Sequence, residues 1–300
     1  MRRLLAILAA ATAAGAAVFW VATMPRGLPR DVLAAWPEGD AGRGEAVFWA
    51  GGCESCHAAK GAKGEDRLKL GGGLVLATPF GDFVVPNISN HPEDGIGGWS
   101  AGDFADAMLR GVSPEGRHYY PAFPYASYTR MEPQDIADLR TFLATLPAVE
   151  GRQPGHDLGF PFNVRRGLGL WKLAFLSDAP AVTLDASDPA VARGQYLVEG
   201  PGHCGECHTP RNLAGASDFA RWLAGAPAAE GEGRVPNITP GGDLGTWSAG
   251  DIEYYLETGF TPDFDTVGGA MVAVQENMAM LQAGERAAIA AYLQAVPAQK

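Results

Sequence analysis

The residues with the clearest chemical meaning are cysteines and histidines in the pattern Cys-x-x-Cys-His. It occurs at Cys53–His57 and at Cys204–His208, and these two copies hold all four cysteines of the chain. Two such thiols can add to the vinyl groups of a haem, and the adjacent imidazole can then reach the iron. The sequence therefore predicts two covalent c-type haems, attached through Cys53, Cys56, Cys204 and Cys207, with His57 and His208 as proximal iron ligands.

Two other uses of paired cysteines fit this sequence less well. A thioredoxin-like redox pair belongs to a βαβ pattern, which the chain does not display around either motif. A zinc site needs two further ligands at short spacing from each pair. No cysteine remains outside the motifs for a disulfide.

The composition bounds the number of domains and the kind of partner. A length of 300 residues predicts two domains at about 150 residues each. The formal net charge of −11 argues against nucleic acid as a partner, because phosphates require a basic surface. An acidic surface suits a protein partner with a basic docking patch.

The first residues predict a membrane anchor. The uncharged run Leu4–Pro25 is long enough to span a bilayer as a helix. A cleaved signal peptide is the alternative, but the apolar run continues through Val18–Val21, beyond the usual length of a signal core. The flanking arginines are balanced and hardly set the orientation. Because c-type haems are attached outside the bacterial cytoplasm, we expect a single-pass inner-membrane protein, periplasmic from about residue 30.

The two halves of the chain repeat each other at an offset near 150 residues. The paired segments are Pro86–Ser89 with Pro236–Thr239, Gly98–Phe104 with Thr246–Ile252, and Leu146-Pro147 with Val296-Pro297. Their order is the same in both halves. A duplicated haem domain is the simplest architecture with this pattern.

Each half carries signals for short helices. Ser100 and Ser248 each precede an aspartate by three residues, as at a capping-box start. Pro133 suits the first turn of a later helix, and further helices are expected at 41–49 and 190–198. We predict an all-α protein with an anchor (1–30), a first haem domain (31–150), a linker or strap (151–185) and a second haem domain (186–300).

Residues 31–300 resemble the multi-haem cytochrome c subunits of membrane-bound bacterial alcohol, aldehyde and gluconate dehydrogenases, and related two-haem cytochromes c. The resemblance rests on the Cys-x-x-Cys-His motifs and the Pro-Asn-Ile and Trp-Ser repeats, together with Cys207–Asn212 and Tyr120–Tyr125. It implies a class I cytochrome c fold in each domain and electron transfer toward the respiratory chain. The familiar dehydrogenase subunits have three haems, whereas this chain has two motifs.

A six-coordinate haem also needs a distal ligand, usually Met or His. In the second half, Met271 follows Val267–Ala270, whose two glycines would let the chain close over the haem. This segment resembles the ligand segment of the family, so we predict Met271 as the distal ligand. Met278 and Met280 are expected to pack.

The first half departs from the family at this point. Many relatives have Met after the Tyr-Pro-Ala segment, where this chain has Phe123. Three hypotheses remain for the first iron: Met131 as the favoured ligand, His118 as a second choice giving a bis-His haem, or an open position. Arg211, in a segment shared with the family, is expected to pair with a haem propionate or to be a solvated loop residue.

The chain lacks signs of a catalytic acid–base constellation, a nucleotide loop, or a molybdenum or flavin site. We therefore expect an electron carrier and not an enzyme. Its partners would be a periplasmic dehydrogenase or quinol-linked complex as donor, and another cytochrome or an oxidase as acceptor. The alternative is a dihaem enzyme of the peroxidase or thiosulfate-oxidising type, with the first haem as reactive centre because of Phe123.

Overall fold

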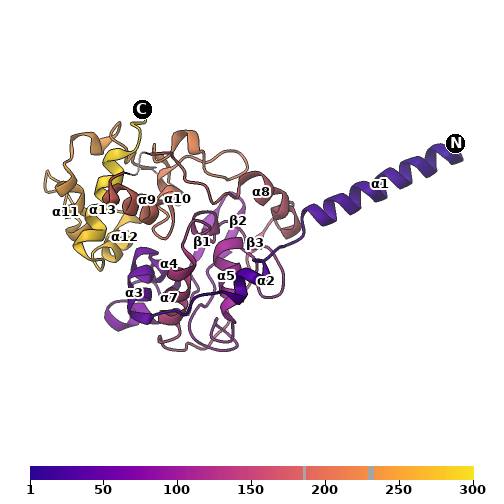
Figure 1. The fold of residues 1–300 in the computed structure, drawn as a ribbon, viewed down its shortest axis with the longest axis horizontal. Coiled ribbons are helices and arrows are strands. Elements are labelled where there is room, and N and C mark those ends of the chain that lie inside the picture. Colours follow the sequence, from indigo (N-terminus) through magenta and orange to yellow (C-terminus); the bar gives the residue numbers. More distant parts are fainter. Residues whose placement is uncertain (185–186, 229–232) are drawn as a thin grey trace.

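The computed structural model describes residues 1–184, 187–228 and 233–300. Its first element, helix α1 (Arg2–Ala22), projects away from the rest of the molecule (Figure 1). The helix has 21 residues and none of them is buried. Within the described ranges it is the one helix long and apolar enough to cross a bilayer, a test that signal sequences also pass.

The first half contains short helices around the first motif. They are α2 (Arg30–Ala34), α3 (Ala41–Ala50), α4 (Cys53–His57), η1 (Gly64–Leu68), α5 (Ala101–Arg110), α6 (Tyr125–Tyr128) and α7 (Pro133–Leu143). Helix α4 is the first Cys-x-x-Cys-His motif itself. The two strands β1 (Val75–Thr78) and β2 (Gly81–Val84) follow η1.

The second half repeats this order. Its elements are α9 (Pro189–Glu199), α10 (Gly205–His208), η3 (Phe219–Arg221), β4 (Ala226–Pro227), β5 (Arg234–Val235), η4 (Asp243–Thr246), α11 (Ala249–Thr258), α12 (Met271–Met278) and α13 (Ala283–Ala295). Helix α10 contains the second motif from Gly205 onward, and Cys204 is its N-cap residue. In Figure 1 these elements gather at the end of the molecule opposite α1.

The helix starts follow the local sequence signals. Ser100 and Ser248 both form complete capping boxes, at the starts of α5 and α11. Pro133 stands at the start of α7, as expected. One start differs from expectation, because Met271 opens the short helix α12 and is not in a preceding loop.

In each half, the helix that precedes the haem motif crosses the last helix at a glycine. A Cβ on Gly44 in α3 would lie 2.0 Å from the carbonyl oxygen of Asp138 in α7. A Cβ on Gly194 in α9 would lie 1.9 Å from the carbonyl oxygen of Ala288 in α13. Only glycine permits such close backbone approach. The same helix pair thus forms the frame of both halves.

The expectation of an all-α protein needs correction, because two small sheets accompany the helices. Strand β2 pairs antiparallel with both β1 and β3 (Asp157–Leu158), and β4 pairs with β5. The strands have two to four residues. Strands this short carry too little alternation to be read from sequence, and β3 is far from β2 along the chain.

Within the described residues, the segment between the halves contains three further elements. After β3 it contains η2 (Arg165–Gly167) and α8 (Leu168–Phe175). Trp171 in α8 donates its indole N–H to the carbonyl of Ala214 in the second half, at 2.9 Å. Lys172 donates to the carbonyl of Gly111 in the first half, at 2.7 Å. The predicted border of this strap, at 185–186, lies outside the described residues.

Candidate haem sites

Both motif histidines are oriented by a proline carbonyl. The Nδ1 atom of His57 lies 2.8 Å from the carbonyl oxygen of Pro86. The Nδ1 atom of His208 lies 2.9 Å from the carbonyl oxygen of Pro236. A carbonyl only accepts hydrogen bonds, so Nδ1 must carry the proton and Nε2 keeps its lone pair for a metal.

Burial keeps these imidazoles neutral. It lowers the pKa of His57 to about 4 and also lowers the pKa of His208. In both cases the hydrogen bond to the proline carbonyl opposes the shift. A neutral imidazole with a fixed tautomer is the form that binds iron.

At each site, a glycine from later in the chain donates a hydrogen bond to the backbone carbonyl of the motif histidine. Gly72 donates its N–H to the carbonyl of His57 at 2.8 Å, and Gly225 donates to the carbonyl of His208 at 2.7 Å. Both glycines have positive φ, +72° and +80°. A Cβ on Gly72 would lie 2.4 Å from the carbonyl oxygen of Pro86, the acceptor of the His57 bond. The turn that positions each histidine therefore requires glycine.

The asparagine of each Pro-Asn-Ile segment ties this loop to the end of its half. Asn87 donates through Nδ2 to the carbonyl of Val149 at 2.7 Å. Asn237 donates in the same way to the carbonyl of Gln299 at 2.9 Å. The sequence shows these segments as repeats but does not reveal this role. Their nearly constant distance from the motif histidine was the available signal.

Haem attachment through the four thiols of the motifs stays a prediction. All four cysteines lie within the described chain and form no disulfide. Burial, with a smaller contribution from the second thiol of the motif, raises the pKa of Cys53 and of Cys204 to about 12. Two thiols and a neutral, oriented imidazole on one helical turn are the donor set that a c-type haem requires.

The first half has Phe123 at the place of Met271. Tyr119 N donates to the carbonyl of Gly111, and Val267 N donates to the carbonyl of Gly259. Phe123 and Met271 each follow these anchored residues by four positions. Both side chains pack on the buried core. A phenyl ring offers no lone pair to iron.

Met131 is buried, with 4% of its surface exposed, beside the turn that precedes the second motif. Its Cγ would lie 3.7 Å from a Cβ on Gly200, and its N–H donates to the carbonyl of Tyr128. Leu281 takes the matching place, with the same bond to Met278. These contacts show Met131 packed in the core. Iron binding by Met131 and by Met271 stays a prediction.

His118 has a different neighbour from the one expected of a ligand. Its Nε2 lies 2.9 Å from the carbonyl oxygen of Thr23, just after α1. Its Nδ1 is buried and makes no hydrogen bond within the described residues. The ring therefore holds the end of α1 against the first half.

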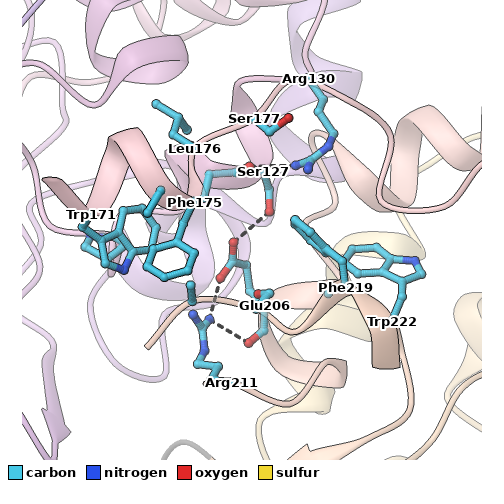
Figure 2. Close-up of a pocket in the computed structure, with 16 residues that line it drawn as sticks. Ser127, Arg130, Trp171, Phe175, Leu176, Ser177, Glu206, Arg211, Phe219 and Trp222 are labelled. Atoms are coloured by element: carbon cyan, nitrogen blue, oxygen red, sulfur yellow. Dashed lines mark hydrogen bonds and ion pairs between the residues drawn. The ribbon is translucent and has the colours of Figure 1, made fainter. Parts of the chain in front are cut away.

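Arg211 contacts the second motif directly. Glu206 stands between the two cysteines of this motif in the sequence. The guanidinium of Arg211 lies 2.5 Å from the Glu206 carboxylate and also donates to the Glu206 backbone carbonyl. Figure 2 shows these bonds at the edge of a cavity of about 210 Å³, between the first half, α8 and α10. A contact of Arg211 with a haem propionate stays a prediction.

Each motif is hydrogen-bonded to the opposite half. Asn277 in α12 donates through Nδ2 to Glu54 Oε1 at 2.9 Å and to Ser55 Oγ at 2.8 Å. Ser127 in α6 donates to Glu206 Oε1 at 2.8 Å (Figure 2). The residues Ser127 and Asn277 occupy matching places in the repeat. The two sites are thus joined by reciprocal contacts, which no local pattern in the sequence indicates.

These duplicated sites define a c-type cytochrome, and comparison with known proteins agrees. A family model described as cytochrome c matches residues 41–147. A protein named diheme cytochrome c-type, from Cereibacter sphaeroides, is 54% identical over 99% of both chains. The chain belongs to this family of dihaem c-type cytochromes, and it carries two covalently bound c-type haems with iron.

Subunits of larger enzymes are also similar. The fructose dehydrogenase cytochrome subunit of Gluconobacter japonicus is 35% identical over 86% of this chain and 52% of its own length. The cytochrome c subunit of the alcohol dehydrogenase (quinone) of Gluconobacter oxydans is 34% identical over 85% and 54%, respectively. The chain thus spans about half the length of these two relatives. The predicted family resemblance is confirmed.

Proposed function

We propose that this chain is a membrane-anchored periplasmic dihaem cytochrome c that carries electrons from a dehydrogenase or quinol-linked donor toward the respiratory chain. The main support is that both sites share one backbone arrangement around an oriented, neutral histidine. Reciprocal hydrogen bonds also join the two sites. Bound haems supply one-electron chemistry. The protein sets their potentials through ligands and burial and holds them at a fixed separation.

The proposed architecture is two class I cytochrome c domains, 31–150 and 186–300, joined by the strap at 151–185. The repeated helix pairs and Gly44 and Gly194 crossings support this division. The proposed haem-binding residues are the four cysteines and Arg211, with His57, Met131, His208 and Met271 at the irons. Two observations support including Met131: it is buried, and its N–H donates to the carbonyl of Tyr128.

Helix α1 is proposed as an uncleaved anchor in the bacterial inner membrane. The chain just after it is built into the folded body, because Thr23 is fully buried. Its hydroxyl accepts a hydrogen bond from Arg166 at 2.9 Å, and its carbonyl faces His118. A segment destined for removal has no need of such contacts.

The names of the relatives support a dehydrogenase subunit as donor, with another cytochrome or an oxidase as acceptor. We test this by purifying the chain from membranes in mild detergent and identifying the proteins that accompany it. Substrate of the accompanying dehydrogenase should then reduce both haems of the purified complex. Copurification without any reduction of the haems by that substrate would contradict the proposed donor.

One observation favours a second function, a dihaem enzyme with the first haem as reactive centre. Phe123 leaves the place of Met271 without a ligand in the first half. Replacing Met131 and His118 one at a time separates the possibilities. Loss of low-spin character at one haem in Met131→Ala assigns the ligand. A first haem that is high-spin before any substitution, and that turns over peroxide, supports the enzyme.

A further inference from the structure

The short helix α8 lies against the point where α1 meets the folded body (Figure 1). A Cβ on Gly169 in α8 would lie 2.5 Å from the Cα atom of Thr23. Arg166, just before α8, places its guanidinium 4.0 Å from the ring centre of Trp20 in α1 and bonds the Trp20 carbonyl. The strap and the end of α1 are therefore one rigid junction.

The length of α1 fixes the depth of this junction. Twenty-one residues at about 1.5 Å each span about 31 Å, close to the hydrocarbon thickness of a bilayer, about 30 Å. When α1 spans the membrane, Trp20 and Thr23 lie at the boundary between hydrocarbon and headgroups. Tryptophan and arginine are favoured at that level. Helix α8, packed on Thr23, must lie at the same depth.

The charge in α8 faces inward. Lys172 interrupts the apolar run 168–176. In the structure its Nζ donates to the carbonyls of Arg110 and Gly111 at 2.6 and 2.7 Å and lies 4.6 Å from the ring centre of Tyr125. The lysine thus caps the C-terminal end of α5. The outer face of α8 is left without charge.

That outer face is apolar. Leu170 and Leu173, one turn apart, are 49% and 70% exposed. Val164, shortly before the helix, is 50% exposed. A cluster of exposed large apolar side chains beside a spanning helix is suited to the boundary region of a bilayer.

From this junction we propose that α8 is a second, non-spanning membrane contact, with Leu170 and Leu173 inserted at the hydrocarbon boundary of the bilayer that α1 crosses. The inference rests on the proposed anchoring by α1 and adds an orientation to it. Because α8 is bonded to both halves through Lys172 and Trp171, this contact holds both haem sites at fixed heights above the membrane.

A polarity-sensitive fluorophore, nitrobenzoxadiazole, tests this in the full haem-loaded chain. It is attached through Leu173→Cys, or through Tyr254→Cys as control. Tyr254 is 48% exposed on α11, at the end of the molecule opposite α1 (Figure 1). The native cysteines are consumed by the haems, so each introduced thiol is the labelling site. A haemochrome assay showing two haems per chain establishes folding.

In vesicles of phosphatidylcholine and phosphatidylglycerol, we expect the label at Leu173→Cys to emit at shorter wavelength than in water. Nitroxide groups on the lipid chains should quench it, whereas the label at Tyr254→Cys should show neither effect. A water-like signal at both positions, in protein that floats with the vesicles, overturns the α8 contact and leaves α1 anchoring intact.

Two further outcomes separate the remaining explanations. A blue-shifted label at Leu173→Cys that lipid nitroxides do not quench means that protein covers α8, which also overturns the proposal. Protein that fails to float with vesicles contradicts the anchoring by α1 itself, on which the inference rests. Labelled Leu170→Cys repeats the measurement one helical turn away, should Leu173→Cys fail to incorporate both haems.

Discussion

At the scale of single residues, the two sites share the surroundings of the motif histidine and differ at the position predicted for the distal ligand. A histidine, a proline carbonyl and a positive-φ glycine recur with nearly the same distances. At the predicted ligand position, Met271 has Phe123 as its counterpart in the repeat. The motif residues could be read directly from the sequence because their spacing is local. The proline and glycine roles could not, because they depend on loops that close onto the histidine.

Replacing Gly72 tests the proximal arrangement. In Gly72→Ala the new methyl group would collide with the Pro86 carbonyl, and the His57 bond would be displaced. We expect fewer chains with two haems and an altered spectrum of the first haem. Gly61→Ala is the matched control, with φ +76° and open space around the Cβ; it should cost only the backbone strain, about 1–2 kcal/mol. Equal haem content in both variants contradicts this role for Gly72.

Replacing Met271 tests the distal ligand of the second haem. Met271→Ala should open that iron to carbon monoxide and lower its potential by on the order of 0.1 V, within the wide range that axial ligands cover. Met280, 51% exposed after the same helix, provides the control Met280→Ala, which should leave both potentials unchanged. Redox titration with optical detection gives the answer. An unchanged second potential in Met271→Ala would remove it from the ligand set.

At the scale of elements, helix starts were predictable and strand pairing was not. The capping boxes at Ser100 and Ser248 are encoded within four residues, so the sequence locates α5 and α11. The β2–β3 pairing joins Asp82 to Asp157 across a long stretch of chain. The orientation of Lys172 likewise depends on α5 being present as a partner, which hydropathy does not report.

The Lys172 contact predicts a dependence of stability on pH. Burial lowers the pKa of Lys172 from 10.5 to about 7. Between these values the unfolded chain binds a proton that the folded chain has released, so the free energy of unfolding rises with pH. Below pH 7 both states are protonated and this dependence ends. Lys172→Met lacks the group, so wild type should gain stability relative to the variant from pH 7 to 10.5. Thermal unfolding in detergent at several pH values measures this; a constant difference contradicts it.

At the scale of the whole molecule, each haem motif is held by the opposite half. Duplication was evident from repeated segments, but the docking of the copies was not, because Asn277 and Ser127 belong to no shared motif. These contacts make the pair of sites one structural unit. The junction between α1 and α8 then relates this unit to the membrane.

The reciprocal contacts predict crossed effects. Asn277→Ala removes the donor to Glu54 and Ser55 and should cost about 1–3 kcal/mol, because it leaves buried polar atoms of the first motif without this donor. It should shift the potential of the first haem, although Asn277 lies in the second half. Ser127→Ala should act on the second haem through Glu206. If each variant instead shifts the haem of its own half, the reciprocal docking is wrong.

The central claim is that this chain carries electrons through two six-coordinate haems. The most direct test is the spectrum of the reduced wild-type protein before and after addition of carbon monoxide, with peroxide turnover measured alongside. A carrier should show two low-spin haems that bind almost no carbon monoxide, and no peroxide turnover. The account would be contradicted if one of the two haems bound carbon monoxide, gave a high-spin signal assigned to the Cys53–His57 site, and turned over peroxide.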